Sequence, residues 1–180
     1  MSGLSIHQGA KRVTTSELAL IPTPTSTNRW KPVPHAEVPA IITEAIDQHG
    51  WKFSHPSNPF DLAVTVDGKK LFGTTDITIP DITCDADYGL SLGFRNSHDK
   101  SISLQFVIGT RVFVCDNMAF SGEVITRRIH YKTINPREEV EKAFSLLPGM
   151  ANMMVTWFSG MKQIGLTQEY GVSFLVECVE

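Results

Sequence analysis

The feature that most constrains the fold is a series of strand patterns between residues 60 and 131. Apolar side chains alternate with other residues along three stretches, which run from Leu62 to Val66, from Leu90 to Phe94 and from Ile102 to Ile108. Such alternation places every second side chain on the same face of a strand, so one face of a sheet is buried. Asp67-Gly68 supplies a tight hairpin turn after the first stretch. We therefore predict an antiparallel meander over residues 60–131, in which 111–115 follows 101–108 directly and a further strand covers 123–131.

Helical patterns flank this series on both sides. Apolar residues recur at helical spacing over residues 36–49, and Gly50 follows as a C-cap. Asn135-Pro136 is a strong helix start, and an apolar stripe continues to residue 164 although Pro148 is expected to interrupt or kink it. These apolar faces need a sheet to pack on, so we predict an α+β fold, an antiparallel β-meander with helices packed on one face. Residues 170–178 alternate enough to form a last strand.

The first 34 residues differ in composition from the rest of the chain. The run IPTPTSTNRWKPVPH has too many prolines for a central strand and too little apolar periodicity for a helix. We predict an extended N-terminal arm over residues 1–34, pinned by Trp30, and one α+β domain over residues 35–180. A chain of 180 residues is long enough to bury a single core of this kind.

Several function classes are disfavoured by simple patterns. The chain has no apolar run long enough to span a membrane, and its N-terminus lacks the basic-then-apolar layout of a secretory signal. The cysteines are odd in number and widely separated, which favours free thiols: Cys84, Cys115 and Cys178. We expect a soluble, cytoplasmic protein that makes no membrane contact, and the sequence gives no reason to expect a cofactor.

Polar residues gather at the ends of two predicted strands. This tip cluster comprises Arg95, Asn96, Ser97, His98, Asp99, Lys100, Asp116 and Asn117. In an antiparallel meander these strand ends meet at one edge, so Arg95 and His98 are expected to share a partly buried surface pocket with Asp116 or Asn117. A turn held by its own side chains explains the same residues, because Asn, Ser and Asp bond nearby backbone groups.

The tip cluster also contains residue types used in catalysis and metal binding. Cys115, His98 and Asn117 are the types found in a cysteine hydrolase, but Cys115 ends an apolar strand and suits a buried position. Imidazole and carboxylate groups suited to a divalent cation also occur here and nearby: His98, Asp99, Asp116 and His130. No pair among them has a diagnostic spacing, so we assign no catalytic residue and no metal ligand.

The charges of the chain are unevenly distributed. The net charge is −3, yet residues 124–137 contain no acid and include a basic strip of Arg127, Arg128, His130, Tyr131, Lys132 and Arg137. On an exposed strand Arg128, His130 and Lys132 would point the same way, and Tyr131 offers a ring on which a base can stack. The basic strip predicts a site for single-stranded nucleic acid, although a pI of 6.1 is low for such a domain. A solvated face on which charges segregate is the alternative.

The segments RNSHDKS and RVFVCDNMAFSG, with PTPT and PVPH before them and RRIH after them, resemble the phage- and plasmid-related family called domain of unknown function 932. The resemblance spans most of residues 20–135 and implies a protein carried by mobile elements, without an established activity. The predicted order of elements also resembles the architecture of single-strand annealing proteins, which pair helices with an antiparallel meander over a basic DNA groove.

We therefore expect a non-enzymatic mobile-element protein that binds single-stranded nucleic acid, assists annealing or recombination, and acts as a homo-oligomer. The alternative is an interaction protein that inhibits a host defence protein or sequesters a small nucleotide through Arg95, His98 and Asp116. A hydrolase that uses His98 and Cys115 is a third hypothesis.

Overall fold

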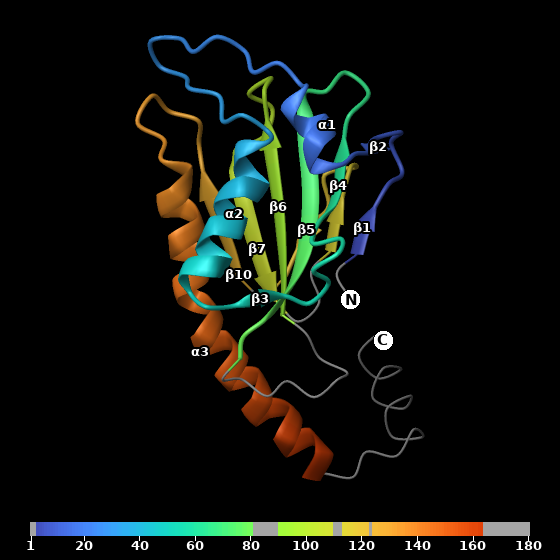
Figure 1. Ribbon diagram of the computed structural model, residues 1–180, viewed down its shortest axis with the longest axis vertical. Coiled ribbons are helices and arrows are strands. Elements are labelled where there is room, and N and C mark those ends of the chain that lie inside the picture. Colours follow the sequence, from blue (N-terminus) through green and yellow to red (C-terminus); the bar gives the residue numbers. More distant parts are fainter. Residues whose placement is uncertain (1–2, 81–89, 110–112, 123, 164–180) are drawn as a thin grey trace, which may run out of the picture.

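The computed structural model describes residues 3–80, 90–109, 113–122 and 124–163 of the chain. These residues form a large antiparallel sheet, with two long helices against one face and a small sheet against the other (Figure 1). Mixed helices and strands of this kind confirm the α+β prediction. The strand predicted over residues 170–178 lies outside the described residues, as do Cys84 and Cys178.

The large sheet contains the predicted meander. Its strands follow the order β10 (Val124–Arg128), β7 (Leu104–Gly109), β6 (Leu90–Ser97), β5 (Lys70–Thr78), β4 (Asp61–Val64) and β2 (Lys11–Arg12), and β3 (Lys52–Phe53) also pairs with β5. Every pair is antiparallel. The turn between β4 and β5 forms at Asp67-Gly68 as predicted, and Gly68 takes a φ of +68°, a conformation that glycine adopts without strain.

The small sheet corrects one part of that prediction. It consists of β1 (Gly3–Ser5), β8 (Phe113–Cys115) and β9 (Phe120–Ser121), and β8 pairs in parallel with β1. The expectation that 111–115 continues the meander beside 101–108 is wrong, because β10 occupies that place next to β7. Phe72 and Val107 lie on the face of the large sheet that carries no helix, and Leu4 and Val114 of the small sheet cover them. Burial of this second apolar face provides the driving force for the arrangement.

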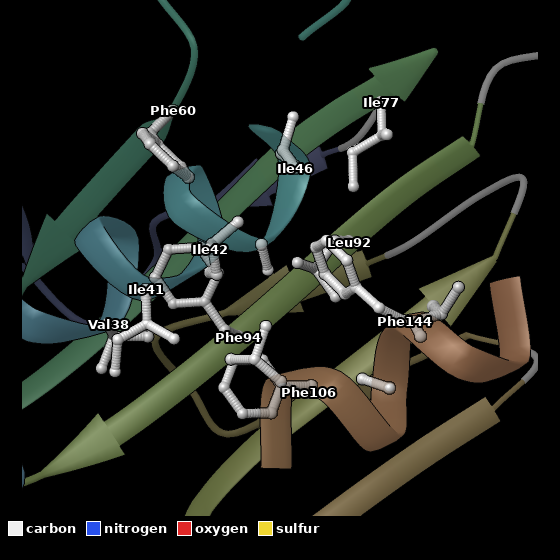
Figure 2. Packing of buried hydrophobic residues seen from close by; sticks show 14 of the residues in the cluster. Val38, Ile41, Ile42, Ile46, Phe60, Ile77, Leu92, Phe94, Phe106 and Phe144 are labelled. Carbon is white, nitrogen blue, oxygen red and sulfur yellow. The ribbon is translucent and has the colours of Figure 1, made fainter. Parts of the chain in front are cut away.

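The main core lies between the large sheet and the helices α2 (Glu37–Gln48) and α3 (Pro136–Gln163). Figure 2 shows the packing of Ile42 from α2 and Phe144 from α3 with Phe94 and Phe106 of the sheet. Both predicted helices are confirmed to within two residues at each end, and they pack on one face as expected. However, α3 continues through Pro148 without interruption.

The N-terminal segment is only partly an extended arm. Its first part contributes β1 and β2 to the two sheets and forms the short helix α1 (Thr15–Ala19), which begins with a capping box between Thr14 and Glu17. The prediction of an arm over all of residues 1–34 is therefore wrong for residues 3–19, which contain these three elements. Residues 21–34, called the arm from here on, have no helix or strand and run across one end of the large sheet (Figure 1).

Candidate nucleic-acid interface

A buried group of polar side chains fixes the arm to the large sheet. This histidine cluster consists of His35, Asn96, His98 and His130, each at most 7% exposed. The rings of His35 and His98 stack with centroids 3.6 Å apart and planes 2° apart. Asn96 Nδ2 donates to the carbonyl oxygen of Val33 at 2.8 Å, and His98 Nε2 lies 3.0 Å from the same oxygen. The histidine cluster therefore ties the last residues of the arm to the end of β6.

The hydrogen bonds define the protonation state of these histidines. Asn96 Nδ2 lies 3.0 Å from His35 Nδ1, so Nδ1 must accept, and His35 Nε2 then donates to the carbonyl oxygen of Gly68 at 3.1 Å. His130 Nε2 lies 2.7 Å from Asn96 Oδ1 and must donate to it. Burial, with the charge of a protonated His98 second, lowers the pKa of His35 to about 3 and that of His130 to about 4. Neutral imidazoles thus satisfy the network at neutral pH.

Beyond the histidine cluster, the arm lies beside the chain that leaves β10. Trp30 and Tyr131 form an isolated antiparallel bridge, and Lys31 N donates to the carbonyl oxygen of His130 at 3.1 Å. Directly opposed residues of an antiparallel pair project to the same side, so the two aromatic side chains share one side. Lys100 Nζ, from the turn between β6 and β7, lies 5.0 Å from the centroid of the Trp30 ring. These three segments meet at one end of the molecule (Figure 1).

We call this surface the aromatic edge, and define it by two rings and four exposed cations: Trp30, Tyr131, Arg29, Lys31, Lys100 and Lys132. Tyr131 is 58% exposed. The acids in the neighbouring turns have partners of their own, since Asp67 pairs with Lys69 at 3.2 Å and Asp99 accepts from the backbone nitrogen of Ser101 at 2.9 Å. The aromatic edge therefore combines positive charge with rings that can stack.

The structure places the residues of the basic strip in different surroundings. Because His130 is buried in the histidine cluster while the Arg128 side chain is 48% exposed, the expectation of an exposed face shared by Arg128, His130 and Lys132 is wrong. His130 is 3% exposed, and Arg128 lies 3.7 Å from Glu139 of α3. The remaining strip arginines also have partners, Arg127 with Ser103 at 3.0 Å and Arg137 with Glu44. Tyr131 and Lys132 are the strip residues that belong to the aromatic edge.

The tip cluster is likewise divided. Arg95 reaches the turn after β8, where its Nη1 donates to the carbonyl oxygen of Met118 at 2.9 Å. His98 is buried against the arm instead, and the Asp116 carboxylate accepts from the backbone nitrogens of residues 7, 8 and 10. The expected pocket of Arg95 and His98 with Asp116 or Asn117 is therefore wrong. Neighbouring residues of an extended strand point to opposite faces, which sends Arg95 and Asn96 to different partners.

The prediction of a self-bonded turn is confirmed at Asp99, whose carboxylate accepts from Ser101, and at Asn117, whose side chain accepts from the backbone nitrogen of Ala119 at 3.2 Å. Cys115 is 1% exposed, and its Sγ lies 3.6 Å from Asp116 Oδ1. In the part of the chain that the structure describes, His, Cys, Asp and Glu side chains form no group of three that could hold a metal ion.

The role of the arm in the aromatic edge also has a signal in the sequence. Trp30 lies between Arg29 and Lys31, just as Tyr131 lies between His130 and Lys132.

Comparisons of the chain with protein-family models, with curated proteins and with solved structures find no match. Among the described helices, none has the length and apolar character needed to cross a membrane.

Proposed function

We propose that this protein binds single-stranded nucleic acid through the aromatic edge. The observation that carries the proposal is the bridge between Trp30 and Tyr131, which sets two aromatic side chains on the same side of adjacent segments. Base stacking on aromatic rings contributes about 1–3 kcal/mol per base and tolerates any sequence. Lys31 and Lys132 flank the rings and are exposed, so they can contact the phosphates on either side of a stacked base.

This form of binding is compatible with the acidic average of the chain. The net charge of −3 disfavours a broad electrostatic surface, but a short aromatic and cationic edge needs few phosphate contacts. The histidine cluster supports such a role because it holds the arm in place before any ligand binds, which lowers the entropic cost of binding. Sequence-independent recognition follows, since no base edge needs to be read.

Fluorescence anisotropy with a labelled thymidine oligonucleotide tests the proposal. We expect Tyr131→Ala to weaken binding by roughly tenfold or more, whereas Tyr131→Phe, which keeps the ring, stays close to the unmodified protein. Lys132→Ala should lower the slope of log affinity against log salt by about 0.7, the amount for one phosphate contact on a single strand. Lys52→Ala is the matched control, because Lys52 is also exposed but lies on β3, away from the aromatic edge.

Two results would contradict the proposal. The first is an unmodified protein that fails to bind single strands even at low salt, where charge screening is weakest. The second is a Tyr131→Ala variant that binds as well as Tyr131→Phe. Circular dichroism of each variant should match that of the unmodified protein, so that unfolding does not account for a loss of binding.

A further inference from the structure

Two arginines lie in one row across β6, β7 and β10, which are adjacent strands of the large sheet (Figure 1). Arg95 of β6 pairs with Gln105 of β7, and Gln105 pairs in turn with Arg127 of β10. Directly opposed residues of antiparallel strands project to the same side of a sheet. Arg95 and Arg127, called the arginine pair from here on, therefore share a face. It is the face that carries the small sheet, because Arg95 also pairs with Phe72 on that face.

Side-chain hydrogen bonds connect the arginine pair. Arg95 Nε donates to Gln105 Oε1 at 2.7 Å, and Gln105 Nε2 donates to Ser103 Oγ at 2.9 Å. Arg127 Nε donates to the same Ser103 oxygen at 3.0 Å. A serine hydroxyl accepts two hydrogen bonds and donates one, so both acceptor positions of Ser103 are used. None of its partners among the described residues accepts the Ser103 proton, which leaves this hydroxyl as a donor for a further group.

The charges of the arginine pair are not neutralised by an acid among the described residues, where neither arginine forms an ion pair. Arg95 Nη1 donates to the carbonyl oxygen of Met118 at 2.9 Å, and the Arg95 guanidinium lies 4.5 Å from the centroid of the Phe120 ring. These partners are uncharged. Burial and, second, the charge of Arg127 lower the pKa of Arg95. Two cations thus repel each other across the row, and an anion between them would remove this repulsion.

We propose that the arginine pair binds a phosphate group, held by Arg95, Arg127 and the Ser103 hydroxyl. Guanidinium groups match the geometry of phosphate oxygens, and each arginine keeps Nη donors that its contacts with described residues do not use. A phosphate group presents three acceptor oxygens, whereas a carboxylate presents two oxygens in one plane. Three donor groups from separate residues therefore favour a phosphate over a carboxylate.

The phosphate group can belong to a free phosphate ester or to the backbone of a nucleic acid. Both sources present the same oxygens to the same donors, so the experiment has to separate them. Arg127 lies on β10, four residues before Tyr131 of the aromatic edge. The donors of the arginine pair are complete without the aromatic edge, so this site binds phosphate whether or not bases stack there.

Nuclear magnetic resonance titration of the full chain with inorganic phosphate, at an ionic strength kept constant with chloride, tests the site. We expect saturable shifts of the backbone amide signals of residues 103–105 and 127. Arg127→Gln should weaken the phosphate affinity about tenfold or more, since it removes charge-assisted hydrogen bonds. Arg128→Gln is the matched control. It removes the same charge from the next residue of β10, which projects to the opposite face and lies 3.7 Å from Glu139.

Three results would overturn the proposal. These are the absence of saturable shifts with phosphate, an equal loss of phosphate affinity in Arg127→Gln and Arg128→Gln, and binding of the dicarboxylate succinate as tight as that of phosphate. A labelled thymidine oligonucleotide then identifies the source. If Arg127→Gln loses affinity for both phosphate and the oligonucleotide, the site holds a nucleic-acid phosphate. If it loses affinity for phosphate alone, the site holds a free phosphate ester. Because phosphate binding is measured without nucleic acid, failure of this site and failure of the aromatic edge are distinguishable.

Discussion

Acidification from pH 7 to pH 5 should destabilise the fold through the histidine cluster. The pKa is about 3 for His35 and about 4 for His130 in the folded protein, against 6.5 for an unperturbed histidine. Because the folded pKa values are depressed, the unfolded chain binds more protons at acidic pH. The stability that the neutral imidazoles contribute is therefore complete above pH 6.5. It is lost as the pH falls from 6.5 to about 4 for His130 and to about 3 for His35.

The magnitude follows from the linkage between proton binding and folding. Each pKa unit corresponds to 1.36 kcal/mol, and pH 5 lies about 1.5 units below the unfolded pKa, so each histidine costs about 2 kcal/mol. His35 and His130 together lower the free energy of unfolding by about 4 kcal/mol at pH 5. This is a large share of the roughly 5–15 kcal/mol that stabilises a typical domain.

Urea unfolding followed by tryptophan fluorescence at pH 7, 6 and 5 measures this loss. His130→Gln keeps a donor for Asn96 Oδ1 but does not titrate. The free energy of unfolding of this variant should therefore fall with acid less steeply than that of the unmodified protein, and the two slopes should differ by about 1.4 kcal/mol per pH unit. His55→Gln serves as control, because the His55 side chain is 69% exposed and lies outside the histidine cluster. Equal pH dependence in His130→Gln and the unmodified protein would refute the reasoning, as would a midpoint that does not change between pH 7 and pH 5.

Two further predictions concern packing and the attachment of the N-terminus. Gly73→Ala should destabilise the protein by about 1–3 kcal/mol in urea unfolding, because the added Cβ would lie 2.3 Å from the buried ring of Phe94. Gly149→Ala in α3 should instead stabilise the protein by about 0.5–1 kcal/mol, because a Cβ added there has no contact within 4 Å outside its own helix backbone. Similar effects for the two variants would contradict the packing described here. Asp116→Asn should cost about 1.5–3 kcal/mol, because an amide cannot accept all three backbone hydrogen bonds that the carboxylate receives. Hydrogen exchange should then become faster at residues 7–10, and unchanged protection there would argue against this role.

The sequence determined those elements whose signals are local. The turn at Asp67-Gly68, the strands around it and the two long helices follow from periodicity, caps and turn residues within a few positions of one another. These signals describe each element and the direction of one apolar face. They also indicated Tyr131 and Lys132 as candidate ligand-binding residues, because an aromatic residue next to a lysine in a segment without acids is visible without a fold.

Only the tertiary structure decided which segments meet. One partner of β8 is β1, more than a hundred residues earlier in the chain, and nothing in three residues of strand specifies so distant a pairing. Likewise, alternation could not show that His130 is buried against Asn96 while Arg128 and Lys132 are exposed. The aromatic edge depends on the arm, which has no periodicity of its own and is positioned by buried contacts of His35 with Asn96 and His98. Long-range burial and hydrogen bonding, rather than local preference, therefore assemble the candidate site.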